Sequence, residues 1–220
     1  MAPTLVNAAV GALLAAALLG AAFDRRSVAV VVGAAILPDL DAVASLVFPG
    51  ATNALFHAVW IPLFVGAALY WDTAVRETSW LSERFGWYGV RVAWVALAAF
   101  VVAGTGPELF GREGVNLLYP IHDAYYLVRG RLVVSTQEGI VQTFVALNAE
   151  GPGILPLESP GTTDSYAIPT WVNPDGQPGL SIDADRELHL VRSGWQAVVV
   201  ASAIATLAVR FGRSRVGVTE

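Results

Sequence analysis

The chain has 220 residues, of which 55% are hydrophobic and 14% are charged, and its mean hydropathy is +0.57. This composition is too apolar for an ordinary soluble domain, so we expect a lipid bilayer to surround part of the chain. Cysteine is absent, which excludes disulfides, thiolate metal sites and a cysteine nucleophile. The net charge of -5 and the pI near 5.2 argue against nucleic acid as a partner.

The basic residues are all arginine, and lysine does not occur. Acidic chains without lysine are common in salt-loving archaea, where surface carboxylates keep the protein hydrated. High-GC codon usage alone would also give the arginine bias, so both explanations stay open.

Five apolar stretches are long enough to cross a bilayer as helices, which takes about twenty residues. The first stretch could instead be a secretory signal, but no basic residue precedes it and Arg25 and Arg26 follow it, so we interpret it as a retained anchor. We therefore predict a mainly α-helical, polytopic membrane bundle of about five transmembrane helices. The stretches cover residues 3–23, 27–48, 54–71, 87–104 and 194–211.

The arginines predict an orientation, because short cytoplasmic loops collect positive charge. Eight of them fall on one side of the predicted membrane, whereas residues 105–193 on the other side carry eleven acidic residues and five arginines. We expect a multi-pass plasma-membrane protein with its amino terminus outside and its carboxyl terminus in the cytoplasm. The eight are Arg25, Arg26, Arg76, Arg84, Arg91, Arg210, Arg213 and Arg215.

The organisation expected from this topology has three parts. Residues 1–104 hold four helices, residues 105–193 form an acidic extracytoplasmic segment, and residues 194–220 hold the fifth helix and a cytoplasmic tail. Within the acidic segment, the β-branched runs 132–135 and 140–147 are separated by Thr-Gln-Glu-Gly, which predicts a β-hairpin. Residues 148–185 are rich in glycine, proline and turn signals, which predicts loops.

Two carboxylates interrupt the second apolar stretch at Asp39 and Asp41. A carboxylate at the centre of a membrane helix costs roughly 2.5 to 3.5 kcal/mol, so a pair requires an explanation. Pro38 cannot donate a backbone hydrogen bond and disfavours helical geometry at Leu37, so we predict a helix break there. An unwound segment could direct both carboxylates to one place, whereas a regular helix would point them to different faces.

Other polar residues are predicted at a similar depth near the outer face, and together with the two aspartates they predict a divalent metal site. Simpler interpretations remain. Asp39 could complement the dipole of a half-helix, Asp41 and His57 could face the membrane interface, and His122 and Asp123 could form a surface turn. The other residues are Asn7, Thr52, Asn53, His57, Glu108, His122 and Asp123.

Residues 37–41 read LPDLD, and with residues 6–11, the turn before His57 and residues 114–120 they carry a family resemblance. Over about residues 1–147 the chain resembles predicted membrane-bound metal-dependent hydrolases related to the LexA-binding inner-membrane family, and it is most similar to their haloarchaeal branch. The LPDLD motif is more specific inside a membrane helix than elsewhere. The resemblance implies metal-dependent hydrolysis, with a lipid or envelope ester as a possible substrate.

Compared with the family pattern, this chain keeps Asp39, Asp41 and His57. Asn7 replaces an early histidine, Thr52 and Asn53 replace a His-Arg pair, and Gly104 and Glu108 replace a final His-x-x-x-Asp motif. A histidine-rich zinc site is therefore incomplete, while amide and hydroxyl oxygens remain suited to hard cations. The cofactor implied is a divalent metal, with Mg, Mn, Ca and Zn all open.

The resemblance implies roles for particular residues. Asp39 and Asp41 would hold the metal, His57 would be a ligand or the general base, and Glu108 or Asp123 would orient water. Asn7, Thr52 and His122 could add ligands. No GxSxG, phosphate loop or HExxH motif offers a different catalytic centre.

Two other functions compete with hydrolysis. The first is a non-catalytic relative that presents its acidic segment to a lipid or to a protein partner that the sequence does not identify. The second is a small ion carrier, which the broken helix with buried acids suggests, although no inverted repeat is visible.

Overall fold

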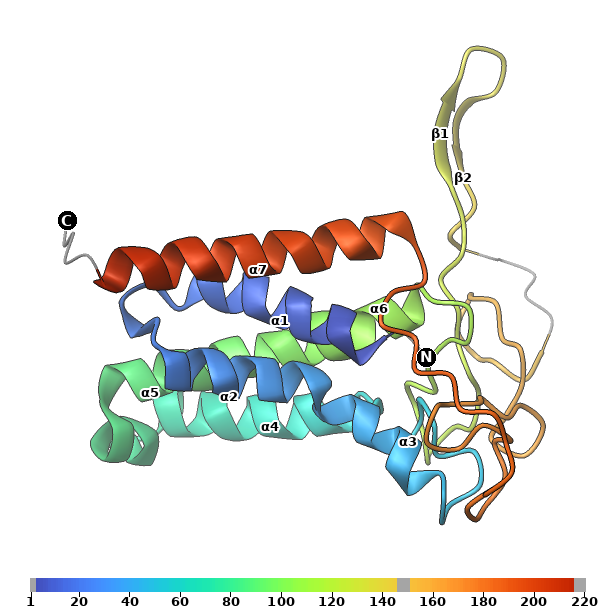
Figure 1. Ribbon diagram of the computed structural model, residues 1–220, viewed down its shortest axis with the longest axis horizontal. Helices are drawn as coiled ribbons and strands as arrows, with labels where there is room; N and C mark the ends of the chain where they lie inside the picture. Colours follow the sequence, from blue (N-terminus) through green and yellow to red (C-terminus); the bar gives the residue numbers. More distant parts are fainter. Residues whose placement is uncertain (1–2, 146–150, 216–220) are drawn as a thin grey trace. The chain divides into compact units, whose positions relative to one another are not determined.

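The computed structural model describes residues 3–145 and 151–215, which are mainly helical with one two-stranded antiparallel hairpin (Figure 1). The chain divides into two compact units. The helical unit consists of Ala2–Leu37, Trp60–Gly104 and His189–Glu220. The loop-rich unit contains Pro38–Val59 and Thr105–Leu188.

The described part of the helical unit contains five α-helices. Short 3-10 or π-helical turns follow several of them. α1, α2 and α7 run through apolar sequence, and α5 is bent where Gly86 adopts a positive φ of 69°. A 3-10 turn, Gly20–Ala22, follows α1, and π-helical turns follow α4 and α5. The helices are α1 (Thr4–Leu18), α2 (Arg25–Ile36), α4 (Trp60–Tyr70), α5 (Trp80–Ala99) and α7 (Gly194–Arg215).

Side chains at the helix ends fix where α2 and α5 begin. Asp24 caps α2 by accepting a hydrogen bond from Ser27 N at 2.7 Å, and this bond lowers the pKa of Asp24. Asp72 accepts from the backbone N–H groups of Trp80 and Leu81 at 3.0 and 3.1 Å. These hydrogen bonds satisfy N–H groups that the first turn of each helix leaves without a helical partner.

Small residues line the contacts between the helices. α1 packs against both α2 and α7, and α2 packs against α5. A Cβ added to Gly11 on α1 would lie 2.6 Å from the Cβ of Ala35 on α2, so glycine permits the two backbones to approach. The fully or nearly buried core residues are Ala15, Leu19, Ala22, Val28, Val31, Ala35, Val95, Ala99 and Ala103.

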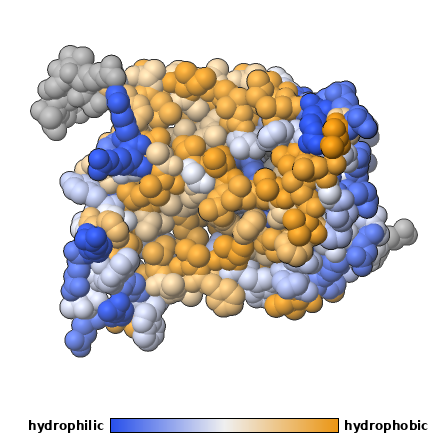
Figure 2. All heavy atoms as spheres, turned by 60° about the horizontal axis from the view of Figure 1, so that its bottom comes forward, coloured by the Kyte–Doolittle hydropathy of each residue, from blue (hydrophilic) through white to orange (hydrophobic). Residues whose placement is uncertain are grey.

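Among the described residues, three helices are long and apolar enough to cross a membrane: Arg25–Ala44, Trp80–Leu109 and Gly194–Arg213. Thr4–Leu18 and Trp60–Val75 are shorter apolar helices. Figure 2 shows apolar side chains covering much of one face of the molecule. Large apolar side chains of the helices are exposed, for example Phe64 of α4 at 68%. Such a surface fits a lipid environment better than water, which agrees with the expectation of a membrane protein.

Several helix limits differ from those predicted. The first α-helix ends at Leu18 instead of residue 23, because Gly20 with φ 56° leaves the helical conformation. The third begins at Trp60 instead of residue 54, since Pro62 is tolerated in the first turn of a helix but not in its interior. The fourth begins at Trp80 instead of residue 87. The predicted start coincides with the bend at Gly86, after which the apolar part of the helix begins.

The loop-rich unit begins where α2 ends. The chain tightens into a 3-10 turn over Leu37–Leu40 and continues as the short α3 (Asp41–Ala44), so the predicted break at Pro38 is confirmed. A second short helix, α6 (Gly106–Leu109), follows α5. Residues 151–188 form mostly turns and irregular segments, in agreement with the loops predicted over 148–185, of which 148–150 lie outside the described residues. Most of residues 110–131 is irregular as well.

The predicted hairpin is also confirmed. β1 (Leu132–Ser135) pairs with β2 (Gly139–Gln142), and Val134 lies opposite Ile140. Gly139 has a φ of 72°, a conformation that glycine adopts readily in a tight turn. The second strand ends at Gln142 instead of residue 147, and residues 146 and 147 lie outside the described residues.

The contact between α1 and α2 predicts an effect of Gly11→Ala. An added methyl group would overlap Ala35, so we expect the free energy of unfolding to fall by about 1 to 3 kcal/mol despite the better helix propensity of alanine. Unfolding of the detergent-solubilised protein, followed by circular dichroism, measures this. Gly33→Ala is the matched control, because no atom lies within 4 Å of a Cβ added there. Equal stability of the two variants would contradict the packing described.

Candidate metal centre

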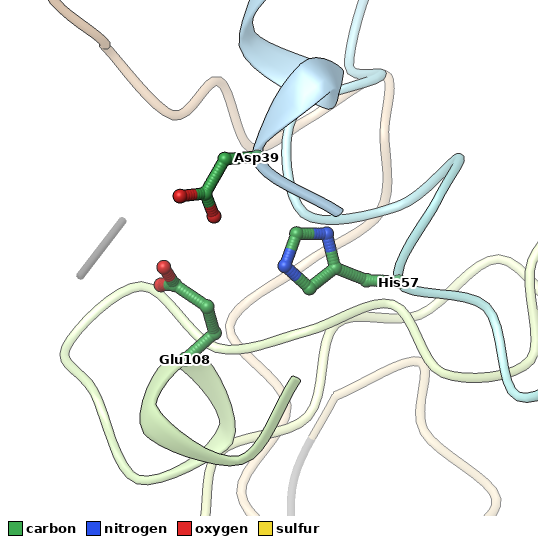
Figure 3. Close-up of side chains that lie close together, drawn as sticks. All are labelled: Asp39, His57 and Glu108. Atoms are coloured by element: carbon green, nitrogen blue, oxygen red, sulfur yellow. The ribbon is translucent and has the colours of Figure 1, made fainter. Parts of the chain in front are cut away.

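Three metal-ligating side chains meet in the loop-rich unit, each from a different local element (Figure 3). Asp39 lies in the 3-10 turn, His57 lies in the irregular segment before α4, and Glu108 lies in α6. Each offers one ligand atom, and these atoms lie within 4.8 Å of one another. Ligands on one ion at bond lengths near 2.1 Å are about 3 to 4 Å apart, so a small adjustment would let all three bind one ion.

The 3-10 turn sets the directions of the two aspartates. Asp39 lies inside the turn and Asp41 begins α3 directly after it. Both are buried, at 8% and 0% exposure, and they approach the His57 ring at different places. Asp39 belongs to the three-residue cluster, whereas Asp41 contacts the other side of the ring. The two carboxylates therefore act on one imidazole in different ways.

Asp41 contacts the His57 ring through one oxygen and the backbone of the preceding residue through the other. Oδ2 lies 2.8 Å from His57 Nδ1, and Oδ1 accepts a hydrogen bond from the backbone N–H of Phe56 at 2.7 Å. An ionised carboxylate can only accept, so Nδ1 carries a proton and the lone pair of a neutral ring lies on Nε2. A carboxylate on the far nitrogen is the usual arrangement for a histidine that binds metal.

The other nitrogen of His57 faces the two remaining carboxylates. In Figure 3 this nitrogen points toward the space between Asp39 and Glu108. His57 is only 1% exposed, and its Nε2 has no hydrogen-bond partner among the described residues. A buried polar atom without a partner is unfavourable unless something binds it. The donor set and this atom therefore fit a cation.

The electrostatics of His57 reflect its anionic surroundings. The negative charges of three carboxylates act on the buried ring, those of Asp41, Glu108 and Asp39. The same carboxylates would attract a divalent cation.

Glu108 is completely buried and is held by Asn53. The amide nitrogen of Asn53 donates to Glu108 Oε2 at 3.2 Å and to the carbonyl of Gly114 at 2.9 Å. Asn53 has a φ of 55°, a conformation that asparagine tolerates better than most residues. The sequence placed Asn53 near the site but did not predict this contact.

The loop that carries Asn53 and His57 is fixed by residues far along the chain. The hydroxyl of Tyr125 lies 2.8 Å from the carbonyl oxygens of both Gly50 and Thr52. Burial raises the pKa of Tyr125, which therefore stays a neutral donor. Asn173 donates to the carbonyl of Ser45 at 3.1 Å. The long segment after residue 105 thus helps to position the ligands.

Asp123 and His122 do not belong to the cluster, and Thr52 and Asn7 are buried polar residues. Asp123 accepts hydrogen bonds from Thr163 and Asn116, so its carboxylate is part of the loop scaffold. The ring of His122 lies beside that of Tyr126, with centroids 6.5 Å apart. The backbone carbonyl of Thr52 accepts from Tyr125, as described above. Asn7 is buried within α1 of the helical unit.

Comparison with protein-family models, with curated proteins and with solved structures finds no match for this chain. The chemistry of the site is therefore argued from its own residues. Its most informative feature is a buried imidazole that is bonded at one nitrogen and faces two carboxylates with the other.

Proposed function

We propose that the chain is a membrane-bound metal-dependent hydrolase whose cation is held by Asp39, His57 and Glu108. The observation that carries this proposal is the buried Nε2 of His57, which lacks a hydrogen-bond partner among the described residues. The ligand atoms of Asp39, His57 and Glu108 lie within 4.8 Å of one another, and Asp41 contacts the opposite nitrogen of the ring. In a histidine with only a structural role, we would expect both buried ring nitrogens to have hydrogen-bond partners.

The ligand types narrow the choice of metal. One imidazole nitrogen with two carboxylate oxygens suits Mn²⁺ or Zn²⁺ better than Ca²⁺ or Mg²⁺, which prefer oxygen ligands alone. Three protein ligands also leave positions for water and for a substrate oxygen, as in catalytic rather than structural sites.

A bound cation would polarise the scissile carbonyl or phosphoryl group and lower the pKa of the attacking water. Asp41 would keep the His57 ring oriented with a proton on Nδ1, so that Nε2 is the nitrogen available to the cation. His57 would have no free basic nitrogen once it bound the cation, whereas a carboxylate has two oxygens, so Asp39 or Glu108 would accept the proton of the attacking water. Burial of the cluster limits access of bulk solvent, which strengthens these electrostatic interactions.

The proposed location is the plasma membrane, with the candidate site on the extracytoplasmic side. The arginine distribution supports five membrane passes with the amino terminus outside and the carboxyl terminus in the cytoplasm of a plasma-membrane protein. Residues 105–193, which carry Glu108, then belong to the extracytoplasmic side. An ester of a lipid or of the cell envelope is the substrate class that such a position favours.

A non-catalytic role is the second candidate, and one observation favours it. Of the three histidines in the chain, His57 alone belongs to the cluster. A site with one imidazole binds transition metals less tightly than a histidine-rich site. In this alternative, the same fold presents its acidic segment to a partner and holds no stoichiometric metal.

Metal content tests the proposal most simply. Elemental analysis of detergent-purified protein incubated with Mn²⁺ or Zn²⁺ and then desalted should give about one equivalent of metal. Asp39→Asn, Glu108→Gln and His57→Gln should each lose most of it, since each removes a ligand. Asp164→Asn is the control, because Asp164 is an exposed carboxylate of the same unit. Absence of metal from the wild-type protein would favour the non-catalytic role.

Activity should follow the metal. We expect metal-dependent release of nitrophenol from a nitrophenyl phosphate or a nitrophenyl ester in mixed micelles, abolished by chelation and by His57→Gln. If the protein bound one equivalent of metal but hydrolysed neither compound, it would be a metal-binding protein, and the proposal that it hydrolyses phosphate or carboxylate esters would be contradicted.

Asp41→Asn should weaken metal binding although all three ligands remain. The amide lacks the charge that supports the protonated Nδ1, so we expect the Mn²⁺ affinity to fall about 10-fold to 100-fold. Titration followed by electron paramagnetic resonance of free Mn²⁺ measures this. An unchanged affinity would show that Asp41 does not act through His57.

A further inference from the structure

Asn53 has two features that together require an explanation. Its amide nitrogen is shared between Glu108 Oε2 and the Gly114 carbonyl, as described above. Its amide oxygen is buried and has no hydrogen-bond partner among the described residues. Because both of the nitrogen's partners are acceptors, the amide cannot be turned over without losing two hydrogen bonds. The bare atom is therefore the oxygen.

We propose that Asn53 is a positioning residue of the metal centre, which holds Glu108 through its nitrogen and a water molecule on the cation through its oxygen. This inference rests on the proposed function, because it presupposes that Glu108 binds a cation. It adds a fourth residue, outside the set of charged and imidazole ligands, and gives the site a fixed place for water.

The contact with Glu108 supports the first half of the proposal. A carboxylate on a flexible side chain can adopt several orientations, and a donor on one oxygen leaves the other oxygen directed elsewhere. Asn53 binds Oε2, and Glu108 offers one carboxylate oxygen to the cluster with Asp39 and His57. The second bond, to Gly114, anchors the amide itself to the backbone of the loop after α6.

The bare oxygen supports the second half. Both amide atoms are attached to one carbon, so Oδ1 lies close to the carboxylate that Nδ2 contacts. Asn53 is fully buried, and a buried acceptor is satisfied most simply by a water that has further partners. A water on a cation between Asp39, His57 and Glu108 has such a partner and can donate to this oxygen.

The backbone at Asn53 makes a clean test possible. A residue at φ 55° is strained when replaced by alanine, but glycine adopts this conformation without cost. Asn53→Gly therefore removes the amide and preserves the loop. Gln196→Ala is the matched control, since Gln196 is also a buried amide and accepts a hydrogen bond from Arg192 N at 2.6 Å, yet it belongs to the helical unit and has no role in the cluster.

The experiment is a Mn²⁺ titration of full-length protein in detergent, combined with thermal unfolding of the metal-free protein. Asn53→Gly should weaken Mn²⁺ binding about 10-fold to 100-fold while the metal-free melting temperature stays near that of the wild type. Gln196→Ala should lower the melting temperature and leave Mn²⁺ affinity within about threefold. Where the glycine variant fails to fold, Asn53→Ser, whose hydroxyl is too short to reach Glu108, replaces it.

A double variant tests whether Asn53 acts through Glu108. If it does, Asn53→Gly combined with Glu108→Gln should bind Mn²⁺ no more weakly than Glu108→Gln alone. Additive losses, or an Asn53→Gly protein with wild-type affinity, would overturn the inference. Failure of the wild-type protein to bind Mn²⁺ would instead overturn the proposed function, so the two failures are distinguishable.

Discussion

The hydrogen bond between Asp41 and His57 is the interaction on which the candidate site depends. It fixes the orientation of the ring, places the proton on Nδ1 and leaves Nε2 directed at Asp39 and Glu108. Without it, a buried imidazole among carboxylates would have no preferred nitrogen to offer. Asp41 is fully buried and its second oxygen binds the Phe56 backbone, so the ring and its loop are held together.

This arrangement depends on the helix break at Pro38. A regular helix would direct Asp39 and Asp41 to different faces, whereas the 3-10 turn followed by α3 brings both against one histidine. Distant loop residues then hold the other side of the site. Tyr125 and Asn173 bind the segment before His57, and Asn53 binds Glu108. The long irregular segment is therefore part of the site's scaffold.

The features that follow from local sequence could be predicted. Pro38 predicted the helix break, Thr-Gln-Glu-Gly predicted the hairpin turn, and the apolar stretches predicted helices suited to a membrane. The roles of individual polar residues could not be separated, because they depend on contacts between segments 15 to 128 positions apart. The prediction from the sequence made Asp39 and Asp41 equivalent metal ligands, and it named no contact for Asn53. The start of α4 also differed, because the prediction followed the apolar run and gave no weight to Pro62, which is tolerated only in the first turn of a helix.

Pulsed electron paramagnetic resonance of Mn²⁺-loaded protein with ¹⁵N-labelled histidine tests the central claim most directly, because it detects a nitrogen bonded to the ion. The account predicts coupling to one imidazole nitrogen, retained in His122→Gln and lost in His57→Gln. Bound Mn²⁺ without nitrogen coupling, or coupling that persists in His57→Gln, would contradict the assignment of His57 as a ligand.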